Sequence, residues 1–463
     1  MRAILGGLTW RRLSLVAVDH LLIVAGVLGA VVIRLSADSP LASWASVWRA
    51  MFAAALLQIA LHYCDLYDLR TVRRRRDLLV GLTQGVGVTA LVLAGLYYWV
   101  PALVVGRGVF LIAGVLVLLL LVVWRVTFEW LSSRLGPTER LLFVGTSSAA
   151  VELARELTER RTELGVELEG FVDVGPSRDR EVGDATPGAL GTVVDIPRIV
   201  RDRRIDRVVV SLADARGMLP MDKLLEMKLT DGVRFDHLPS VYEEYTGKIA
   251  VENLRPSWLI FSEGFRKTRA LVTAKRLLDI SLAGLGLLAA APVMGLVAIA
   301  VRRSSPGPAL YHQTRVGQNG RPFTVHKFRS MRADAEAATG AVWAQKGDPR
   351  VTPFGRFMRR TRLDELPQLW NVLRGDMSFV GPRPERPEFV SDLTQQIPFY
   401  GQRHAVRPGL TGWAQVRHSY GSSVADALQK LQFDLYYIKH MSIAFDLYIV
   451  LETTKTVLMR RGS

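Results

Sequence analysis

The chain has very little cysteine and histidine. Cys64 is the single cysteine in 463 residues, so an intrachain disulfide and a multi-cysteine zinc site are excluded and a reducing compartment is allowed. The chain has eight histidines, and those at His312, His326, His404, His418 and His440 lack the paired spacing of zinc ligands. Acidic residues are also in deficit, because 43 Asp and Glu oppose 59 Lys and Arg and leave a net charge of +16. Such a charge indicates an anionic partner, and a mean hydropathy of +0.19 favours a membrane over nucleic acid.

The N-terminal third holds long apolar stretches. Four of them, at residues 13–35, 44–64, 78–100 and 109–131, reach the ~20 residues that cross a bilayer core. We therefore expect a four-helix transmembrane bundle over residues 1–136. Positive charge clusters before the first stretch, between the second and third, and after the fourth, at Arg2, Arg11, Arg12, Arg73, Arg74, Arg75, Arg76, Arg134 and Arg140. The positive-inside rule then puts both ends of the bundle in the cytoplasm, and the four consecutive arginines serve mainly as a topology determinant.

The middle of the chain, residues 137–265, reads as a Rossmann-like α/β module. Short apolar runs near 140–144, 170–174 and 207–212 alternate with helical patterns, which predicts a parallel sheet. Gly145 and Ala150 match the first and last positions of a G-x-G-x-x-G/A fingerprint, but Ser147 replaces the glycine that lets the backbone approach a pyrophosphate. A structural or regulatory module is therefore favoured over dinucleotide binding.

A fifth apolar stretch covers residues 280–301. Lys275 and Arg276 precede it, and Arg302 and Arg303 follow it, so the positive-inside rule draws both ends to one side. Pro292 lies in its middle, where it removes a helical hydrogen bond and favours a bend. We expect a re-entrant helix that enters the membrane and returns. An ordinary fifth span with a proline kink is the alternative.

The C-terminal third contains the segment LDELPQLWNVLRGD. Leu366, Leu369, Trp370 and Leu373 have helical spacing and predict one apolar face, while Gly375 suits a C-terminal cap. Asp364 then lies at or near the N-cap with Glu365 beside it, where a helix end attracts phosphate. An isolated Asp-Glu pair would be read as a helix cap. Here, however, basic residues gather in the same segment, at Lys327, Arg329, Arg359, Arg360, Arg362, Arg383 and Arg407.

This combination is what phosphoryl transfer uses. Arginine, lysine and a divalent metal stabilise the charge on the transferred group, and a carboxylate can be the nucleophile or can hold Mg²⁺. Each arginine taken alone is also compatible with a lipid headgroup contact or a solvated charge.

Several ordered motifs carry a family resemblance: KRLLD at Lys275 to Asp279, GPRPE around Arg383, RPGLTGW after Arg407, and the segment quoted above. Together they resemble the bacterial polyprenol-phosphate phosphoglycosyl transferases of the monotopic type, and the whole chain is similar to the large members that initiate exopolysaccharide, capsule or O-antigen synthesis. The resemblance implies a mostly α-helical catalytic domain at 266–463 with its re-entrant helix near 280–301. One departure is Ala291 before Pro292, where small relatives have serine.

The resemblance also implies an activity. Asp364 would attack the sugar-bearing phosphate of a UDP-sugar and release UMP, Glu365 would ligate Mg²⁺, and undecaprenyl phosphate would accept the phospho-sugar. Substrate-binding roles fall on Lys327, Arg329, Arg359, Arg383 and Arg407. The expected location is the bacterial inner membrane with the catalytic domain on the cytoplasmic face, with lipid but no nucleic acid as partner, and a homo-oligomer is allowed.

Two other functions fit parts of the chain. A membrane-anchored, NAD-dependent nucleotide-sugar epimerase or dehydratase would use the middle module, but it needs a Tyr-x-x-x-Lys pair that Tyr242 with Thr246, and Tyr245 with Ile249, do not supply. A non-enzymatic scaffold for polysaccharide assembly would need only the spans and the basic surface.

Overall fold

The computed structural model describes residues 10–35, 44–64, 66–67, 75–103, 106–134, 139–173, 189–211, 220–251, 256–332, 334–335, 348–418, 421 and 423–458. The arginines at 2, 73 and 74 lie outside these ranges, as do the side chains of those at 11, 12, 75, 76 and 134. Contacts divide the chain into two compact units that meet between Val241 and Tyr242. The second unit thus begins before residue 266, where the sequence placed the catalytic domain.

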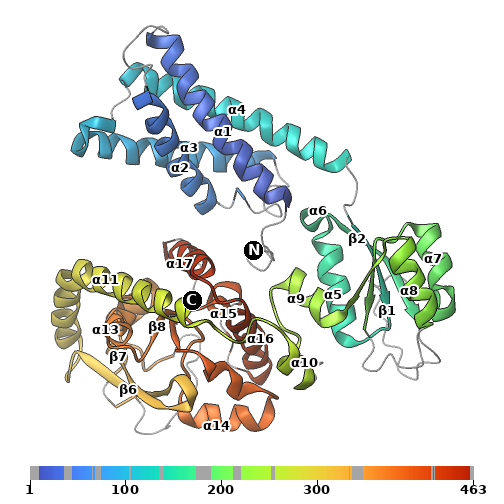
Figure 1. Ribbon diagram of the computed structural model, residues 1–463. Helices are drawn as coiled ribbons and strands as arrows, with labels where there is room; N and C mark the ends of the chain where they lie inside the picture. The colour runs from blue at the N-terminus through green and yellow to red at the C-terminus, as the bar shows by residue number, and fades with distance from the viewer. Residues whose placement is uncertain are drawn as a thin grey trace. The chain divides into compact units, whose positions relative to one another are not determined.

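The first four long helices form a bundle in which neighbours lie alongside one another (Figure 1). They are α1 (Trp10–Leu35), α2 (Trp44–Tyr63), α3 (Arg75–Trp99) and α4 (Arg107–Arg134), with the short 3₁₀ helix η4 (Pro101–Leu103) before α4. Leu15, Leu82 and Leu121 are fully buried inside the bundle, whereas Leu91 and Leu111 are 76% and 71% exposed. Large leucines facing outward on a helix bundle indicate a lipid environment.

Three of these helices and one later helix are long and apolar enough to cross a membrane. The segments are Leu13–Arg34, Leu78–Trp99, Gly108–Leu131 and Arg269–Ser304. The chain is therefore a membrane protein. Inside the bundle, Arg125 Nη2 donates to Asp19 Oδ2 at 2.7 Å and both side chains are buried, so these ionisable groups are paired rather than facing lipid.

The middle module is a five-stranded parallel sheet, as predicted, with strand order β3-β2-β1-β4-β5. Two of its strands, β3 and β5, lie at the sheet edges and were not predicted, because their side chains are partly exposed and show no apolar run. The strands are β1 (Glu139–Val144), β2 (Val166–Asp173), β3 (Ala189–Thr192), β4 (Arg207–Val210) and β5 (Arg234–His237). The helices are α5 (Ser148–Glu159), α6 (Arg161–Leu164), η5 (Val193–Asp195), α7 (Ile196–Arg203) and α8 (Met221–Thr230).

The turn at Gly145 forms as the sequence predicts, but the Ser147 side chain occupies hydrogen-bonding groups within it. Gly145 follows β1 with a φ of +92°, a conformation that favours glycine. Ser147 caps α5 by accepting a hydrogen bond from the amide of Ala150, and its Oγ lies 2.5 Å from Ser211 Oγ. Ser147 therefore has a local structural role in the turn.

The second unit is mostly helical and holds two small sheets. β6 (Leu310–Val316) and β7 (Pro322–Phe328) form an antiparallel hairpin closed by η7 (Gln318–Gly320), and β8 (Ser378–Val380) pairs in parallel with β9 (Gly409–Thr411). The helices are α9 (Leu238–Thr246), α10 (Pro256–Phe261), α11 (Arg269–Ser304), α12 (Pro353–Thr361), η8 (Leu363–Glu365), α13 (Gln368–Arg374), α14 (Pro387–Gln396), η9 (Tyr400–Ala405), α15 (Trp413–Arg417), α16 (Val424–His440) and α17 (Ile443–Leu458).

The start of this unit is held by the end of α9 and the residues after it. Glu243 pairs with Lys439 of α16 at 2.7 Å and also contacts His440. Trp413 Nε1 donates to the carbonyl of Gly247 at 2.9 Å. These contacts place residues 242–251 with the C-terminal helices, which explains why the boundary comes so early. They also make Trp413 part of the buried core.

The helix α11 contains the fifth apolar stretch. It is helical throughout, with Pro292 inside it, and it changes direction near its middle (Figure 1). Before the proline, Ala283 packs with Leu369 and Val325, and after it, Val301 packs with Met358 and Phe328. Both halves therefore contact the same globular unit, and Leu366 touches both clusters. Both ends of α11 therefore lie against this unit, as the re-entrant helix expected from the sequence requires.

Candidate active site

The Asp-Glu pair lies between two short helices. α12 ends at Thr361, Arg362 reverses the chain with a left-handed φ of +58°, and Asp364 and Glu365 follow inside the 3₁₀ turn η8. The sequence placed Asp364 at or near the N-cap of this helix. The N-cap of α13 is Pro367, so Asp364 precedes the cap position within η8 and does not cap the helix itself. Gly375 ends α13 with a φ of +102°, as predicted.

One face of α13 anchors it to the hairpin. Asn371 is fully buried, donates to the carbonyl of Thr324 at 2.7 Å, and accepts from the amide of His326 at 3.1 Å. Leu369 is buried on this side, but Trp370 is 53% exposed and does not belong to the predicted apolar face. The helix faces the hairpin through Asn371, which turns Trp370 outward.

The KRLLD motif joins α11 to the rest of the site. Arg276 donates to the carbonyls of Val372 and Leu373 at 2.6 and 2.7 Å, and so satisfies the C-terminal end of α13. Lys275 pairs with Asp446 of α17 at 2.6 Å in a buried position. Asp279 accepts from the Ser378 hydroxyl and the Phe379 amide at 3.0 and 2.8 Å. The KRLLD motif thus joins α11 to α13, α17 and β8.

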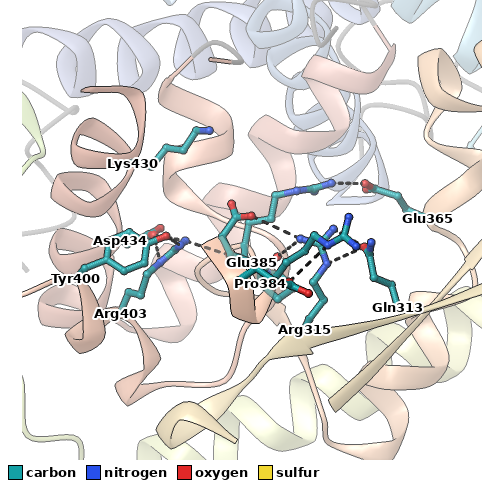
Figure 2. A network of polar contacts seen from close by, with 12 residues as sticks. Gln313, Arg315, Glu365, Pro384, Glu385, Tyr400, Arg403, Lys430 and Asp434 are labelled. Carbon is teal, nitrogen blue, oxygen red and sulfur yellow. Dashed lines mark hydrogen bonds and ion pairs between the residues drawn. The ribbon is translucent and has the colours of Figure 1, made fainter. Parts of the chain in front are cut away.

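Glycines allow β8 and β9 to approach each other closely, and this contact fixes the start of the segment that carries Arg383. A Cβ on Gly409 would lie 2.1 Å from the nitrogen of Gly381, closer than any real contact. Arg383 follows Gly381 in the GPRPE segment, and its carbonyl accepts from Arg403 Nη2 at 3.0 Å. Arg403 is in turn buried against Asp434 at 2.8 Å, and Figure 2 shows this pair with Tyr400 beside it. Arg403 was not predicted, since nothing in its sequence context distinguishes it from a solvated arginine.

Arg383 reaches back to the Asp-Glu pair. Its Nη2 lies 2.7 Å from Glu365 Oε1, and Arg362 Nη1 lies 3.5 Å from the same oxygen (Figure 2 shows the first contact). Burial alone would raise the pKa of Glu365, but Arg383 and then Lys327 outweigh it and lower the pKa to about 2. Glu365 is therefore a fixed negative charge at neutral pH.

Asp364 behaves differently from its neighbour. It is 8% exposed, and its Oδ1 is buried without a hydrogen-bond partner in the part of the chain that the structure describes. Burial and then the charge of Glu365 raise its pKa, against the opposing effect of Lys327 and Arg359. A carboxylate oxygen without a partner, beside cations, has the properties of a nucleophile toward a phosphate.

Basic side chains and one amide form a pocket next to this pair, lined by Arg315, Val325, Lys327, Gln368, Arg383 and Pro384. Burial and then Arg383 lower the pKa of Lys327 to about 8. Arg315 and Gln368 were not predicted as site residues. Gln368 follows Glu365 by three positions in the same motif, which is the one signal that pointed to it, whereas Arg315 lies in a strand with no motif of its own.

The other predicted binding residues have separate places. Arg359 donates to Ser330 Oγ at 2.9 Å and is near enough to Asp364 to lower its pKa. Arg329 donates to the carbonyls of Pro306 and Ser305 at 2.5 and 2.7 Å, and so holds the chain after α11. Arg407 is partly buried beside the β8–β9 contact. Neither Arg329 nor Arg407 lines the pocket formed by the described residues.

The number of carboxylates near Asp364 and Glu365 limits the kind of metal site that the protein could form. Within the described ranges, no group of three or more His, Cys, Asp or Glu side chains could hold a metal ion. His312 and His326 face each other across the hairpin, with Nδ1 atoms 2.8 Å apart, but remain a pair. Mg²⁺ in phosphoryl-transfer sites takes only one or two carboxylates, together with substrate phosphates and water. The orphaned oxygen of Asp364 and the ionised Glu365 fit that kind of site.

Comparisons with known proteins agree with the sequence resemblance. Residues 270–460 match the bacterial sugar transferase family, and residues 62–225 match a CoA-binding domain. A UDP-N-acetylgalactosamine-undecaprenyl-phosphate N-acetylgalactosaminephosphotransferase of Aeromonas hydrophila is 38% identical over 260 residues, which cover 56% of this chain and 60% of the relative.

Two further relatives carry glucose in their names. A UDP-glucose:undecaprenyl-phosphate glucose-1-phosphate transferase of Escherichia coli (strain K12) is 35% identical over 343 residues, 71% of this chain and 70% of the relative. An enzyme of the same name from Caulobacter vibrioides is 46% identical over 186 residues, 40% of this chain and 69% of the relative. The chain spans 60% of the length of the Aeromonas relative. From its matched motifs and the extent of the Escherichia coli match, the chain belongs to the bacterial sugar transferase family.

Proposed function

We propose that this protein transfers a sugar 1-phosphate from a UDP-sugar to undecaprenyl phosphate, releases UMP, and thereby initiates exopolysaccharide, capsule or O-antigen synthesis. The observation that carries the proposal is the buried, unpartnered carboxylate oxygen of Asp364 among phosphate-binding cations. The names of the relatives supply the substrate classes.

The chemistry is a double displacement at one phosphorus atom. An Asp364 oxygen attacks the sugar-bearing phosphorus, the bond to the UMP oxygen breaks, and UMP leaves with the electron pair. A phosphate oxygen of the lipid then attacks the same phosphorus, and the carboxylate of Asp364 leaves with its electron pair. Lys327 and Arg383 stabilise the negative charge on the phosphates in both steps.

Glu365 has a different role from Asp364. Its low pKa keeps it ionised, so it would hold Mg²⁺ against the diphosphate while also orienting Arg383 through the 2.7 Å contact. A bound Mg²⁺ would supply charge neutralisation to the phosphate oxygens.

Membrane placement supports the lipid as acceptor. Because both halves of α11 contact the catalytic unit, its apolar middle can dip into one leaflet without carrying the following chain across. Leu285, Leu288 and Leu296 on this helix are 68%, 77% and 69% exposed, as lipid-facing residues would be. The expected location is the cytoplasmic face of the bacterial inner membrane, where the lipid headgroup meets the site.

The test is nucleophile removal with a matched control. Membranes carrying the parent or the Asp364→Asn variant are incubated with UDP-glucose or UDP-N-acetylgalactosamine and Mg²⁺, and UMP release is measured. We expect release to fall to background in Asp364→Asn and to stay at the parent rate in Asp392→Asn, which changes an exposed aspartate of α14.

Acid-quenched parent protein should also retain labelled sugar phosphate on a peptide that contains residue 364. Release at the parent rate by Asp364→Asn, or an adduct on another residue, would refute the nucleophile assignment. If the parent consumes no sugar nucleotide at all, the result would instead favour a non-enzymatic scaffold.

A further inference from the structure

Gln368 is a buried amide in the pocket beside the Asp-Glu pair, and its Nε2 has no partner. The side chain is 4% exposed, and Nε2 finds no hydrogen bond within the described parts of the chain. A buried donor left unsatisfied destabilises the folded protein. Apolar side chains of similar size would avoid this cost, so the amide indicates that the pocket binds something with acceptor oxygens.

The other groups of the pocket define the charge of that ligand. Lys327 is partly buried and its ammonium has no hydrogen bond among the described residues, while Arg315 is held by Gln313 at 2.6 Å and by the carbonyl of Pro384 at 3.1 Å. Arg383 is the third cation that lines the pocket. Figure 2 shows Arg315 between Gln313 and Pro384. The six lining residues include three cations and no carboxylate. The pocket therefore fits a small polyanion such as a phosphate group.

The nucleophile is close by but does not line the pocket. Asp364 precedes Gln368 by one short turn, yet the lining consists of other residues. A phosphate in the pocket would thus be a neighbour of the phosphorus under attack. On an in-line path, the group that leaves when Asp364 attacks lies opposite the carboxylate, and the group that later displaces the carboxylate must enter from the same direction.

In the function proposed above, these two groups are chemically alike. The leaving group is UMP and the entering group is undecaprenyl phosphate, and both are phosphate monoesters. They act at different times, since UMP must depart before the lipid phosphate can attack.

We propose that the pocket lined by Arg315, Lys327, Gln368 and Arg383 is one phosphate-monoester subsite used twice, with the Gln368 amide as a direct ligand. It first holds the phosphate of UMP, which takes the electron pair of the broken P–O bond. It then holds the lipid phosphate, whose oxygen forms the new P–O bond as the Asp364 carboxylate leaves. This inference rests on the proposed covalent intermediate and adds a shared binding site for both partners.

The experiment separates the two half-reactions in the full-length protein in membranes. The first arm follows exchange of labelled UMP into the UDP-sugar without lipid acceptor, which gives a KM for UMP. The second arm varies undecaprenyl phosphate at a saturating concentration of the UDP-sugar, which gives a KM for the lipid. The variant is Gln368→Met, which keeps the length of the side chain but removes the donor, and the control is Gln396→Met on the exposed face of α14.

We expect Gln368→Met to raise both KM values by a similar factor, about 10-fold or more, because hydrogen bonds to charged groups contribute about 1.5–3 kcal/mol. Gln368→Glu should raise both further, since it places a negative charge opposite the phosphates. Gln396→Met should match the parent. Thermal unfolding of the detergent-extracted Gln368→Met protein, compared with the parent, checks that the variant is folded.

The outcomes distinguish this inference from the function on which it rests. If only the UMP arm or only the lipid arm changes, the shared subsite is wrong and Gln368 serves one partner. If the parent exchanges UMP and Gln368→Met does so with unchanged KM values, the amide is not a ligand although the intermediate stands. If the parent itself exchanges no UMP, the covalent intermediate fails and the shared subsite fails with it.

Discussion

The buried pair of Arg403 and Asp434 gives a sharp prediction because it links the stability of the catalytic unit to the position of Arg383. Asp434 Oδ2 accepts from Arg403 Nη2 at 2.8 Å and from Nε at 3.1 Å, with side-chain exposures of 2% and 5%. Replacing Asp434 by Asn removes the carboxylate that is hydrogen-bonded to this buried guanidinium. Breaking such a pair from one side costs about 3–5 kcal/mol.

For a unit of this size, that loss lowers the Tm by roughly 6–20 °C. The assay is thermal unfolding of the detergent-extracted protein, with Glu388→Gln as control. Glu388 pairs with Arg386 at 3.8 Å and is 60% exposed, so its loss should cost less than about 1 kcal/mol.

Activity gives a second readout that a purely structural role would not move. The double variant Arg403→Met with Asp434→Leu replaces the ion pair by apolar side chains and should recover much of the stability. It also removes the donor to the carbonyl of Arg383, so UMP release should remain well below the parent rate at temperatures where the protein is folded. A Tm equal to the parent in Asp434→Asn, or full activity in the double variant, would refute this reasoning.

Three further predictions concern the site. Lys327 has a pKa near 8 because of burial and Arg383, so it is cationic below that pH; kcat/KM for UMP release should fall as pH rises through about 8 in the parent, and Lys327→Arg should shift the fall upward. An unchanged profile in that variant would exclude Lys327 as the titrating group. Gly409→Ala should destabilise the unit by about 1–3 kcal/mol or more, since its Cβ would meet Gly381 at 2.1 Å, whereas Gly401→Ala has open space and should match the parent in thermal unfolding. Removal of divalent metal with EDTA should abolish UMP release until Mg²⁺ is restored, and Glu365→Gln should need more Mg²⁺; release that persists in EDTA would count against a metal.

Hydrophobic patterns in the sequence predict most of the architecture. Membrane helices, the parallel order of β1, β2 and β4, and the turn at Gly145 all depend on local periodicity and backbone preference. The edge strands β3 and β5 escaped prediction because they pair through backbone hydrogen bonds while their side chains stay partly exposed. Asp364 does not cap α13, because it lies in the turn η8 that follows the left-handed Arg362, and the N-cap position of α13 is Pro367.

The sequence by itself determined which kinds of group are available: a carboxylate pair, many cations, glycines for close strand contact, and a proline in an apolar helix. Only the tertiary structure decided which of the cations meet. Arg383 contacts Glu365, and Lys327 lines the same pocket as Arg383. Arg329 instead donates to the carbonyls of Pro306 and Ser305. Spacing along the chain specifies local conformation, but the partner of a long flexible side chain depends on which segments fold against each other, and that is a property of the packed unit.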